Sequence, residues 1–207
     1  MRVARTRRSV TGVARGARIR QDVNPAFPCK LCGAPLERRP RRGPGVPRGA
    51  LQILCPRCRF RMFDYPRVCI GFTVIRRDHL LMLTRGHEPR RGAIDLPGGF
   101  LEPGEALEAA ARRELREETG LRVGSASLLA TYWDVYDLPG FGPFPTLNYY
   151  YFARWRSGVP RAADDAADAR WVPLAELGGR ALQRRFAWSH MRQVVRDVRE
   201  RAHADGR

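Results

Sequence analysis

Three glutamates near the middle of the chain could hold a cation. Glu114, Glu117 and Glu118 lie in a stretch whose Leu, Ala, Glu and Arg content favours a helix over residues 105–119. At 100° per residue, all three fall on the side that carries the apolar residues of the preceding turns. Carboxylates this close repel one another, and desolvation adds to the cost. A divalent cation with oxygen ligands would compensate for it, whereas a solvated acidic patch is the alternative that helix geometry leaves open.

The residues around these glutamates form a longer pattern at fixed spacing. A pattern with nine specified positions almost never arises by chance, unlike a lone glycine motif. The stretch resembles the Nudix signature, G-x5-E-x7-R-E-U-x-E-E-x-G-U with U a bulky aliphatic residue. The matching residues are Gly99, Glu105, Arg113, Glu114, Leu115, Glu117, Glu118, Gly120 and Leu121.

The resemblance implies an enzyme that hydrolyses the diphosphate linkage of a nucleoside diphosphate derivative, giving a nucleoside monophosphate and a phosphorylated product. It implies that Glu114, Glu117 and Glu118 bind Mg²⁺ or Mn²⁺, which neutralises the diphosphate and activates water. A carboxylate then takes the proton of that water. Family members use a box glutamate or an acid of a later loop, here Asp164 or, as our first choice, Asp165. A solvated acidic loop is the alternative for these two residues.

Four further residues take supporting roles under the same resemblance. Arg113 would orient the carboxylates through charge-assisted hydrogen bonds. Glu105 would lie at the helix N-terminus, where the helix dipole favours an anion, and would support the metal site. Gly98 and Gly99 would let the backbone approach the phosphates closely.

Four of the five cysteines form two C-x-x-C pairs, Cys29/Cys32 and Cys55/Cys58. This spacing predicts a structural zinc site in a small ribbon, with the insert between the pairs folding back as a β-hairpin. A redox dithiol pair is the alternative. Cys69 lies in an apolar run and is expected in the core. Cysteines of this kind favour a reducing cytoplasm over a secreted disulfide scaffold.

A ribbon just ahead of a Nudix domain resembles two groups, the NADH pyrophosphatases and a family active on ADP-ribose or FAD. The first group carries a Ser-Gln-Pro-Trp-Pro-Phe-Pro stretch after the box, and residues 121–155 do not contain it. The Cys-x2-Cys-Gly spacing and Tyr65-Pro66 ahead of the first long strand favour the second group.

The pattern along the chain predicts three segments: a disordered basic tail over 1–24, a zinc ribbon over 25–64 and a Nudix domain over 65–207. The fold class is α/β of the α+β kind, a mixed sheet between helices with the box as loop–helix–loop. Strands are expected at 67–75, 80–83, 127–135, 147–155 and 168–172, a loop at 137–145, a short helix at 173–177 and a final helix at 186–202.

Aromatic residues near the expected loop are candidates for binding the substrate. Trp133, Tyr136, Phe141, Phe144 and Tyr149 surround it, and Trp133, Tyr136 and Phe144 are the preferred set. Aromatic rings stack on flat rings such as a nucleobase. The alternative is that these side chains fill the sheet and the base of the loop.

The charge is concentrated at one end of the chain. The formal net charge is +17, of which residues 1–63 carry +14. This supports a rival interpretation, a nucleic-acid-binding ribbon with a Nudix domain that senses a ligand, or a Nudix hydrolase acting on RNA 5′ ends. We favour a small nucleotide as the substrate over nucleic acid. A homodimer is one option for the assembly. No apolar run approaches the ~18 residues of a membrane span.

Overall fold

The computed structural model describes residues 28–44, 51–63, 66–138 and 142–204. The expected basic tail over 1–24 and Phe141 lie outside these residues. The elements are β1 (Glu37–Pro40), β2 (Leu51–Leu54), β3 (Arg61–Phe63), β4 (Arg67–Arg76), β5 (His79–Arg85), β6 (Ile94–Asp95), β7 (Gly98–Phe100), α1 (Leu107–Thr119), β8 (Ala126–Leu138), β9 (Gly142–Arg154), β10 (Ala166–Pro173), the 3-10 helix η1 (Glu176–Gly178), α2 (Arg180–Gln183) and α3 (Met191–Ala204).

The larger sheet is mixed, and β4 lies at its centre. The strand order is β10-β5-β4-β9-β8, with β6 added to β5 and β7 added to β4. β4 runs parallel to β9, and the other pairs are antiparallel. One edge of β4 pairs with β7 at Cys69–Gly71 and with β5 at Ile75–Arg76. The strand that leads directly into the Nudix-like box is therefore fixed to the centre of the sheet.

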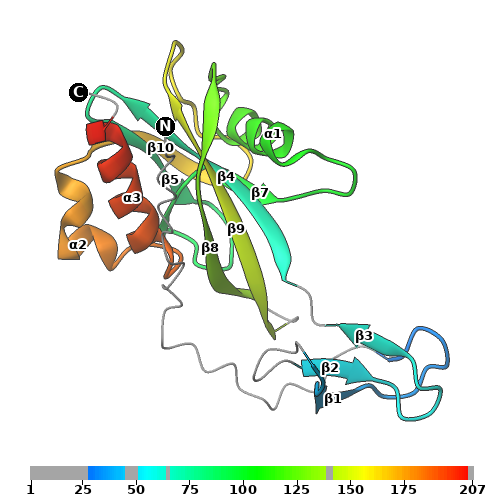
Figure 1. The fold of residues 1–207 in the computed structure, drawn as a ribbon. Coiled ribbons are helices and arrows are strands. Elements are labelled where there is room, and N and C mark those ends of the chain that lie inside the picture. Colours follow the sequence, from blue (N-terminus) through cyan, green and yellow to red (C-terminus); the bar gives the residue numbers. More distant parts are fainter. Residues whose placement is uncertain (1–27, 45–50, 64–65, 139–141, 205–207) are drawn as a thin grey trace, which may run out of the picture.

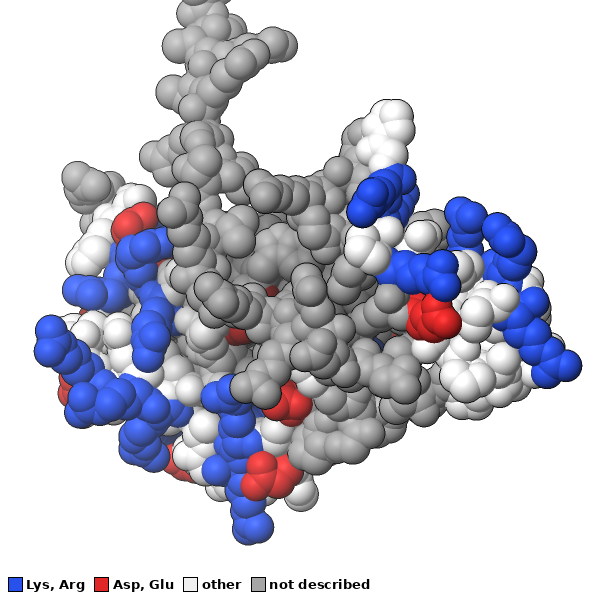
Figure 2. All heavy atoms as spheres, turned by 90° about the horizontal axis from the view of Figure 1, so that it is seen from below, with Lys and Arg blue, Asp and Glu red and all other residues white. Residues whose placement is uncertain are grey.

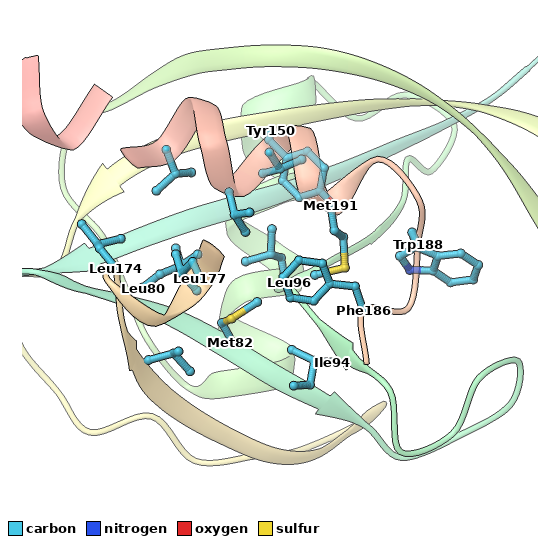
Figure 3. Packing of buried hydrophobic residues seen from close by; sticks show 14 of the residues in the cluster. Leu80, Met82, Ile94, Leu96, Tyr150, Leu174, Leu177, Phe186, Trp188 and Met191 are labelled. Carbon is cyan, nitrogen blue, oxygen red and sulfur yellow. The ribbon is translucent and has the colours of Figure 1, made fainter. Parts of the chain in front are cut away.

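Helices cover both faces of this sheet, and each interface forms its own core. α1 packs on one face through Ala110, Ala111 and Leu115 against β4 residues such as Phe72. α3 packs on the other face, as Figure 1 shows, and η1 adds Leu177 to the same core. Figure 3 shows the second core, in which Met191, Phe186 and Leu96 lie together and Trp188 stands at its margin. The predicted mixed sheet between helices is confirmed.

Two expected elements differ in their extent. The loop expected at 137–145 is mostly strand, because β8 continues to Leu138 and β9 begins at Gly142. Pro143 and Pro145 fit there because β9 pairs with β4 only from Thr146 onward, so one edge of this segment needs no N–H donors. The short helix expected at 173–177 is instead the end of β10 followed by η1 at 176–178.

The final helix begins later than expected. α3 starts at Met191, not at residue 186. The backbone of the preceding segment is bound to β6 instead, because Ile94 donates its N–H to Arg185 O and Ala187 donates its N–H to Ile94 O. Backbone groups that are hydrogen-bonded to a strand are not free to continue a helix.

The smaller sheet consists of β1, β2 and β3 and lies within the segment predicted as a ribbon. β1 and β2 pair antiparallel, from Glu37 opposite Leu54 to Pro40 opposite Leu51, so the insert between the cysteine pairs folds back as a hairpin. Leu36 and Ile53 pack beside Cys29 and Cys55 in a small core of their own. No helix in the described parts of the chain is long and apolar enough to cross a bilayer.

Candidate functional site

The box helix α1 presents its glutamates at its C-terminal half. The helix begins at Leu107, two residues after the expected start, and ends at Thr119. Gly120 closes it at φ 70° and donates its N–H to Arg116 O at 2.8 Å, as the predicted glycine cap requires. Glu118 is buried, whereas Glu117 is exposed. The apolar stripe fixes the helix on β4 and thereby fixes the direction of these carboxylates.

Arg113 links the residues of the box to one another. Its Nε and Nη2 donate to Oε1 and Oε2 of Glu105 at 2.8 Å each. Its Nη1 donates to Glu114 Oε1 at 2.8 Å and to Glu117 Oε2 at 3.0 Å. The hydrogen bonds from Arg113 lower the pKa of Glu105 to about 2. One guanidinium thus holds three carboxylates in place.

Glu118 is the most buried acid of the box and has no cationic partner among the described residues. Its Oε2 accepts the Gly98 N–H at 2.8 Å. Burial raises its pKa to about 8, and the nearby charges of Asp95, Glu114 and Asp165 act in the same direction against the Gly98 hydrogen bond. The position therefore favours the binding of a positive charge.

Gly98 and Gly99 bring the β7 backbone close to β4 and to the box. A Cβ at Gly98, where φ is +156°, would overlap Ile70 O, so the position needs glycine for both space and conformation. A Cβ at Gly99 would overlap Glu114 Oε1. Gly98 therefore lets β7 pack closely on β4, and Gly99 leaves room for the Glu114 carboxylate beside the β7 backbone.

These residues form one side of a pocket of about 420 Å³. Its wall contains the box acids together with polar and aromatic residues of β8, β9 and the segment before α3. The lining includes Asp95, Gly98, Gly99, Glu114, Glu117, Glu118, Asp134, Tyr136, Thr146, Asn148, Tyr150, Asp164, Asp165, Trp188 and His190. The volume is in the range of small-molecule sites.

The structure brings some of the other predicted residues to this pocket and not others. Asp164 and Asp165 line it, although both are exposed. Tyr136 also lines it, and Phe144 stacks on Tyr136 with ring centroids 5.5 Å apart. Trp133 does not line the pocket; its side chain is 58% exposed. Alternate residues of a strand face opposite sides, so Trp133 points away from the side on which Tyr136 lies.

Tyr149 and Cys69 also depart from the simplest expectation. Tyr149 packs with the α1 core and does not line the pocket. Cys69 is partly buried as expected in a strand, but it also lines the pocket. Burial raises the pKa of its thiol to about 12, so it stays protonated.

Sequence reasoning missed two clusters at the inner side of the pocket. In the first, Asp95 accepts hydrogen bonds from Arg85 Nη1 at 3.0 Å and Trp188 Nε1 at 2.8 Å. In the second, Asp134 Oδ2 lies 2.6 Å from His190 Nδ1. Asp95 and Trp188 are 93 residues apart in the sequence, and Asp134 and His190 are 56 residues apart, so no local spacing could indicate these contacts.

The box acids fit a divalent cation by their chemistry. Glu114, Glu117 and Glu118 offer oxygen donors, which Mg²⁺ and Mn²⁺ prefer. Arg113 Nη1 is the positive group between Glu114 and Glu117. Glu118 carries no such partner, and its raised pKa marks a carboxylate that a nearby cation would stabilise in its charged form.

The four cysteines of the ribbon converge on one point. The Sγ atoms of Cys29 and Cys58, and those of Cys32 and Cys55, lie 3.5 Å apart, and all four lie within 4.8 Å of one another. Four sulfurs around a tetrahedral zinc at ~2.3 Å would be ~3.8 Å apart. The described cluster therefore has the size of a zinc site.

The fold and the site together define a class: a mixed sheet between helices whose loop–helix–loop directs an acidic cluster into a nucleotide-sized pocket. A family model described as NUDIX domain matches residues 65–198. The ADP-ribose pyrophosphatase of Methanocaldococcus jannaschii is 32% identical over 120 residues, which are 58% of this chain and 69% of that protein. The chain belongs to the Nudix family, and it is a Nudix hydrolase.

Two other similarities extend this result. The NAD-capped RNA hydrolase NudC of Chromobacterium violaceum is 28% identical over 194 residues, which are 92% of this chain and 66% of that protein. That match is long enough to include the cysteine pairs. A solved bifunctional NMN adenylyltransferase/ADP ribose pyrophosphatase from Francisella tularensis, in complex with AMP and a manganese ion, is 28% identical with a TM-score of 0.51, covering 67% of this chain and 42% of that one. The chain spans about half the length of several other NudC relatives.

Proposed function

We propose that this chain hydrolyses the diphosphate bond of ADP-ribose, FAD or a similar dinucleotide, with release of a nucleoside monophosphate. The observation that carries the proposal is the placement of Glu114, Glu117 and Glu118 with Gly98 and Gly99 along one side of a pocket of about 420 Å³. The opposite side offers polar and aromatic groups at which a nucleoside could bind.

In this proposal the box glutamates hold Mg²⁺ or Mn²⁺. The ion, when bound, neutralises the diphosphate and lowers the pKa of water. Arg113 keeps Glu114 and Glu117 on the pocket side, and Glu105 holds the guanidinium in turn. The phosphates are proposed to lie against the β7 backbone at Gly98 and Gly99, where the absence of a side chain permits close approach. Because these groups are fixed on a packed helix and a central strand, little reorganisation accompanies the reaction.

The proton acceptor for the attacking water is proposed to be Asp165. It lines the pocket from the segment ahead of β10, on the same side as the box. The position of this segment is fixed by backbone hydrogen bonds from Arg161 N–H to Thr119 O and from Ala163 N–H to Glu118 O. An acid held next to the end of α1 in this way can reach water beside the metal ligands.

Relatives support the choice of substrate. The Methanocaldococcus protein is an ADP-ribose pyrophosphatase, and the Francisella protein, solved with AMP and a manganese ion, is a bifunctional NMN adenylyltransferase/ADP ribose pyrophosphatase. We propose by analogy that this chain uses the same substrate class and a similar ion.

A second candidate function is hydrolysis at the 5′ end of a nucleotide-capped RNA. The match to Chromobacterium NudC, an NAD-capped RNA hydrolase, covers the ribbon as well as the Nudix domain. Figure 2 shows Lys and Arg side chains on the ribbon and on the part with α2 and α3. Basic surfaces attract a polyanion in a salt-dependent way.

The ribbon is proposed to bind one structural zinc through Cys29, Cys32, Cys55 and Cys58. Four sulfur ligands close the coordination sphere, which leaves no position for a substrate. The backbone N–H of Cys58 donates to Cys55 Sγ at 3.5 Å. This hydrogen bond favours the thiolate form of Cys55, which is the form that binds a metal.

A substrate panel tests these proposals. The full chain would be assayed with Mg²⁺ or Mn²⁺ on ADP-ribose, FAD, NADH, a sugar nucleotide, an NTP and an NAD-capped RNA of defined length, with products identified by mass. Preferred turnover of ADP-ribose or FAD to a monophosphate supports the first proposal. Preferred turnover of the capped RNA, falling steeply with salt, favours the second, and turnover only of NTPs contradicts both.

A further inference from the structure

The inner floor of the pocket is built by one face of β9. Thr146, Asn148 and Tyr150 alternate along this strand and all line the pocket. Across the sheet, Asn148 lies opposite Cys69 of β4, and Cys69 lies opposite Phe100 of β7. Two strand spacings, ~10 Å, therefore separate Asn148 from the β7 backbone beside the box acids.

The Asn148 amide has a defined orientation. Its Nδ2 donates to Tyr132 O and to Thr146 Oγ1, both at 3.1 Å, so both N–H groups are used. Oδ1 accepts no hydrogen bond from the described residues. Among the described residues, the one side-chain N or O atom that is fully buried and lacks a hydrogen-bond partner is Trp171 Nε1. Asn148 Oδ1 also lacks a partner, so it must be accessible to solvent. The residue is 7% exposed, so this carbonyl oxygen opens into the pocket.

Neighbouring hydrogen bonds hold this floor rigid. His190 lies 2.6 Å from Asp134 Oδ2 through Nδ1 and 3.2 Å from the Tyr150 hydroxyl through Nε2. The His190 backbone N–H also donates to Asp134 Oδ2 at 3.0 Å. Asp134 is therefore occupied by its own partners, whereas Asn148 Oδ1 has no donor among the described residues and can accept a hydrogen bond from a ligand.

We propose that Asn148 is a specificity-determining residue that accepts a hydrogen bond from the exocyclic amino group of adenine. The inference rests on the proposed function, because it assigns the nucleoside half of the substrate to the inner side of the same pocket. Tyr136 and Trp188, whose rings stack 4.6 Å apart on each other, also line the pocket and add apolar surface that a flat base can contact.

Hypoxanthine is the base that distinguishes this arrangement. It has the size and shape of adenine, but a carbonyl oxygen replaces the amino group. Asn148 Oδ1 would then face a second acceptor, and its Nδ2 cannot turn towards the base without giving up Tyr132 O and Thr146 Oγ1. A buried acceptor without a donor is costly, so we expect the wild type to prefer adenine at least about tenfold.

Kinetic discrimination tests the proposal. kcat/KM would be measured for ADP-ribose and inosine diphosphate ribose with the wild type, Asn148→Ala and Tyr151→Phe. Tyr151 lies on the same strand but packs in the α1 core, so it controls for disturbance of β9. We expect an adenine preference of at least tenfold in the wild type and Tyr151→Phe, falling to about one in Asn148→Ala. A wild type that turns over both substrates equally, or an Asn148→Ala variant that keeps the preference, overturns the proposal.

A binding measurement keeps the test valid if Asn148→Ala does not fold or if ADP-ribose is not the substrate. AMP, IMP and ribose 5-phosphate would be titrated into the wild type by calorimetry. Binding of AMP at least tenfold tighter than IMP supports the role of Asn148. Equal affinity for AMP and IMP, or ribose 5-phosphate binding as tightly as AMP, overturns it. Failure of the substrate panel with retained AMP preference would refute only the proposed function.

Discussion

Arg113 donates one hydrogen bond to each carboxylate oxygen of Glu105, from Nε and from Nη2, at 2.8 Å in both cases. Its third donor, Nη1, reaches Glu114 and Glu117 inside the helix. The guanidinium therefore connects the turn that precedes α1 with the acids proposed to hold the metal. The fork geometry of arginine is needed for this, because a single ammonium cannot satisfy both oxygens of Glu105 and two further carboxylates in one plane.

Arg113→Lys should lower kcat/KM by at least tenfold, which is ~1.4 kcal/mol of transition-state stabilisation. The charge is retained, but the bidentate contact and the position of Glu114 are lost. Steady-state kinetics with saturating Mg²⁺ or Mn²⁺ would measure the effect. Arg116→Lys is the matched control, because Arg116 is exposed on the same helix, and its activity should equal that of the wild type. Equal activity of Arg113→Lys and Arg116→Lys would contradict the positioning role.

Glu117→Gln and Glu118→Gln should each reduce activity by more than about 100-fold, because each removes one charged oxygen ligand from the proposed ion site. The fold should remain, since glutamine keeps the size of the side chain and can still accept the Gly98 N–H. Activity would be measured with titrated Mn²⁺, and the unfolding temperature without metal. Glu176→Gln is the control, because the Glu176 side chain is exposed and lies outside the pocket. Full turnover by either box variant, or wild-type turnover in EDTA, would refute the proposed site.

The purified protein should contain about one zinc per chain, separate from the catalytic ions. Cys29→Ser and Cys58→Ser should lose this zinc and unfold at lower temperature before they alter the chemistry, because a structural zinc contributes folding free energy. Metal analysis by mass spectrometry and thermal unfolding would measure both effects. Cys69→Ala should keep one zinc, because Cys69 lies outside the cluster. Protein made with zinc available that contains none would disprove the site.

The part of the site that could be predicted is the part that depends on local spacing. The helical repeat places Glu114, Glu117 and Glu118 on one side of α1, and Gly120 ends the helix. Both features follow from the local sequence and do not depend on tertiary contacts. The start of the helix was predicted two residues early. Glu105 stays outside it because its carboxylate accepts the Glu102 N–H and binds Arg113.

The inner side of the pocket could not be predicted, because it is made of tertiary contacts. Asp134 and His190 are 56 residues apart, and neither stands in a recognisable motif. The segment that carries Trp188 and His190 was assigned to a helix on its apolar pattern. Its backbone is held by Ile94 instead, and only the folded sheet provides that partner. Trp133 was expected near the substrate but lies on the opposite face of β8 from Tyr136, because side chains three residues apart on a strand point to opposite sides.

The Asp134–His190 contact should make stability depend on pH in the acid range. Burial raises the pKa of Asp134, but the hydrogen bonds from His190 and Val135 outweigh it and lower the value from 3.8 to about 2. Because the folded pKa lies below the unfolded value, the carboxylate stabilises the fold above about pH 4, and this contribution is lost as pH falls towards 2.

Asp134→Asn should therefore lower the free energy of unfolding at pH 7 by about 2 kcal/mol and flatten its decrease between pH 4 and pH 2. Urea unfolding at a series of pH values would measure the difference. Asp137→Asn, an exposed residue at the end of the same strand, should change neither quantity. Parallel acid curves for Asp134→Asn and the wild type would show that the contact does not stabilise the charged form.

Deletion of residues 1–22 should leave hydrolysis of small dinucleotides largely unchanged. The deleted stretch carries seven Arg and one Asp and lies outside the described residues, and its sequence offers no apolar pattern with which to dock on the domain. A cationic segment can raise the encounter rate with anions, but at physiological salt the Debye length is ~8 Å and this steering is screened. Catalysis should depend instead on the acids that Arg113 holds on α1.

Full-length and shortened proteins would be compared on ADP-ribose and on a capped RNA, at low and physiological salt. If the shortened protein loses more than tenfold of its activity on ADP-ribose at physiological salt, ~1.4 kcal/mol, the segment is part of the active site. If activity is lost only on the capped RNA, the segment binds the RNA polyanion.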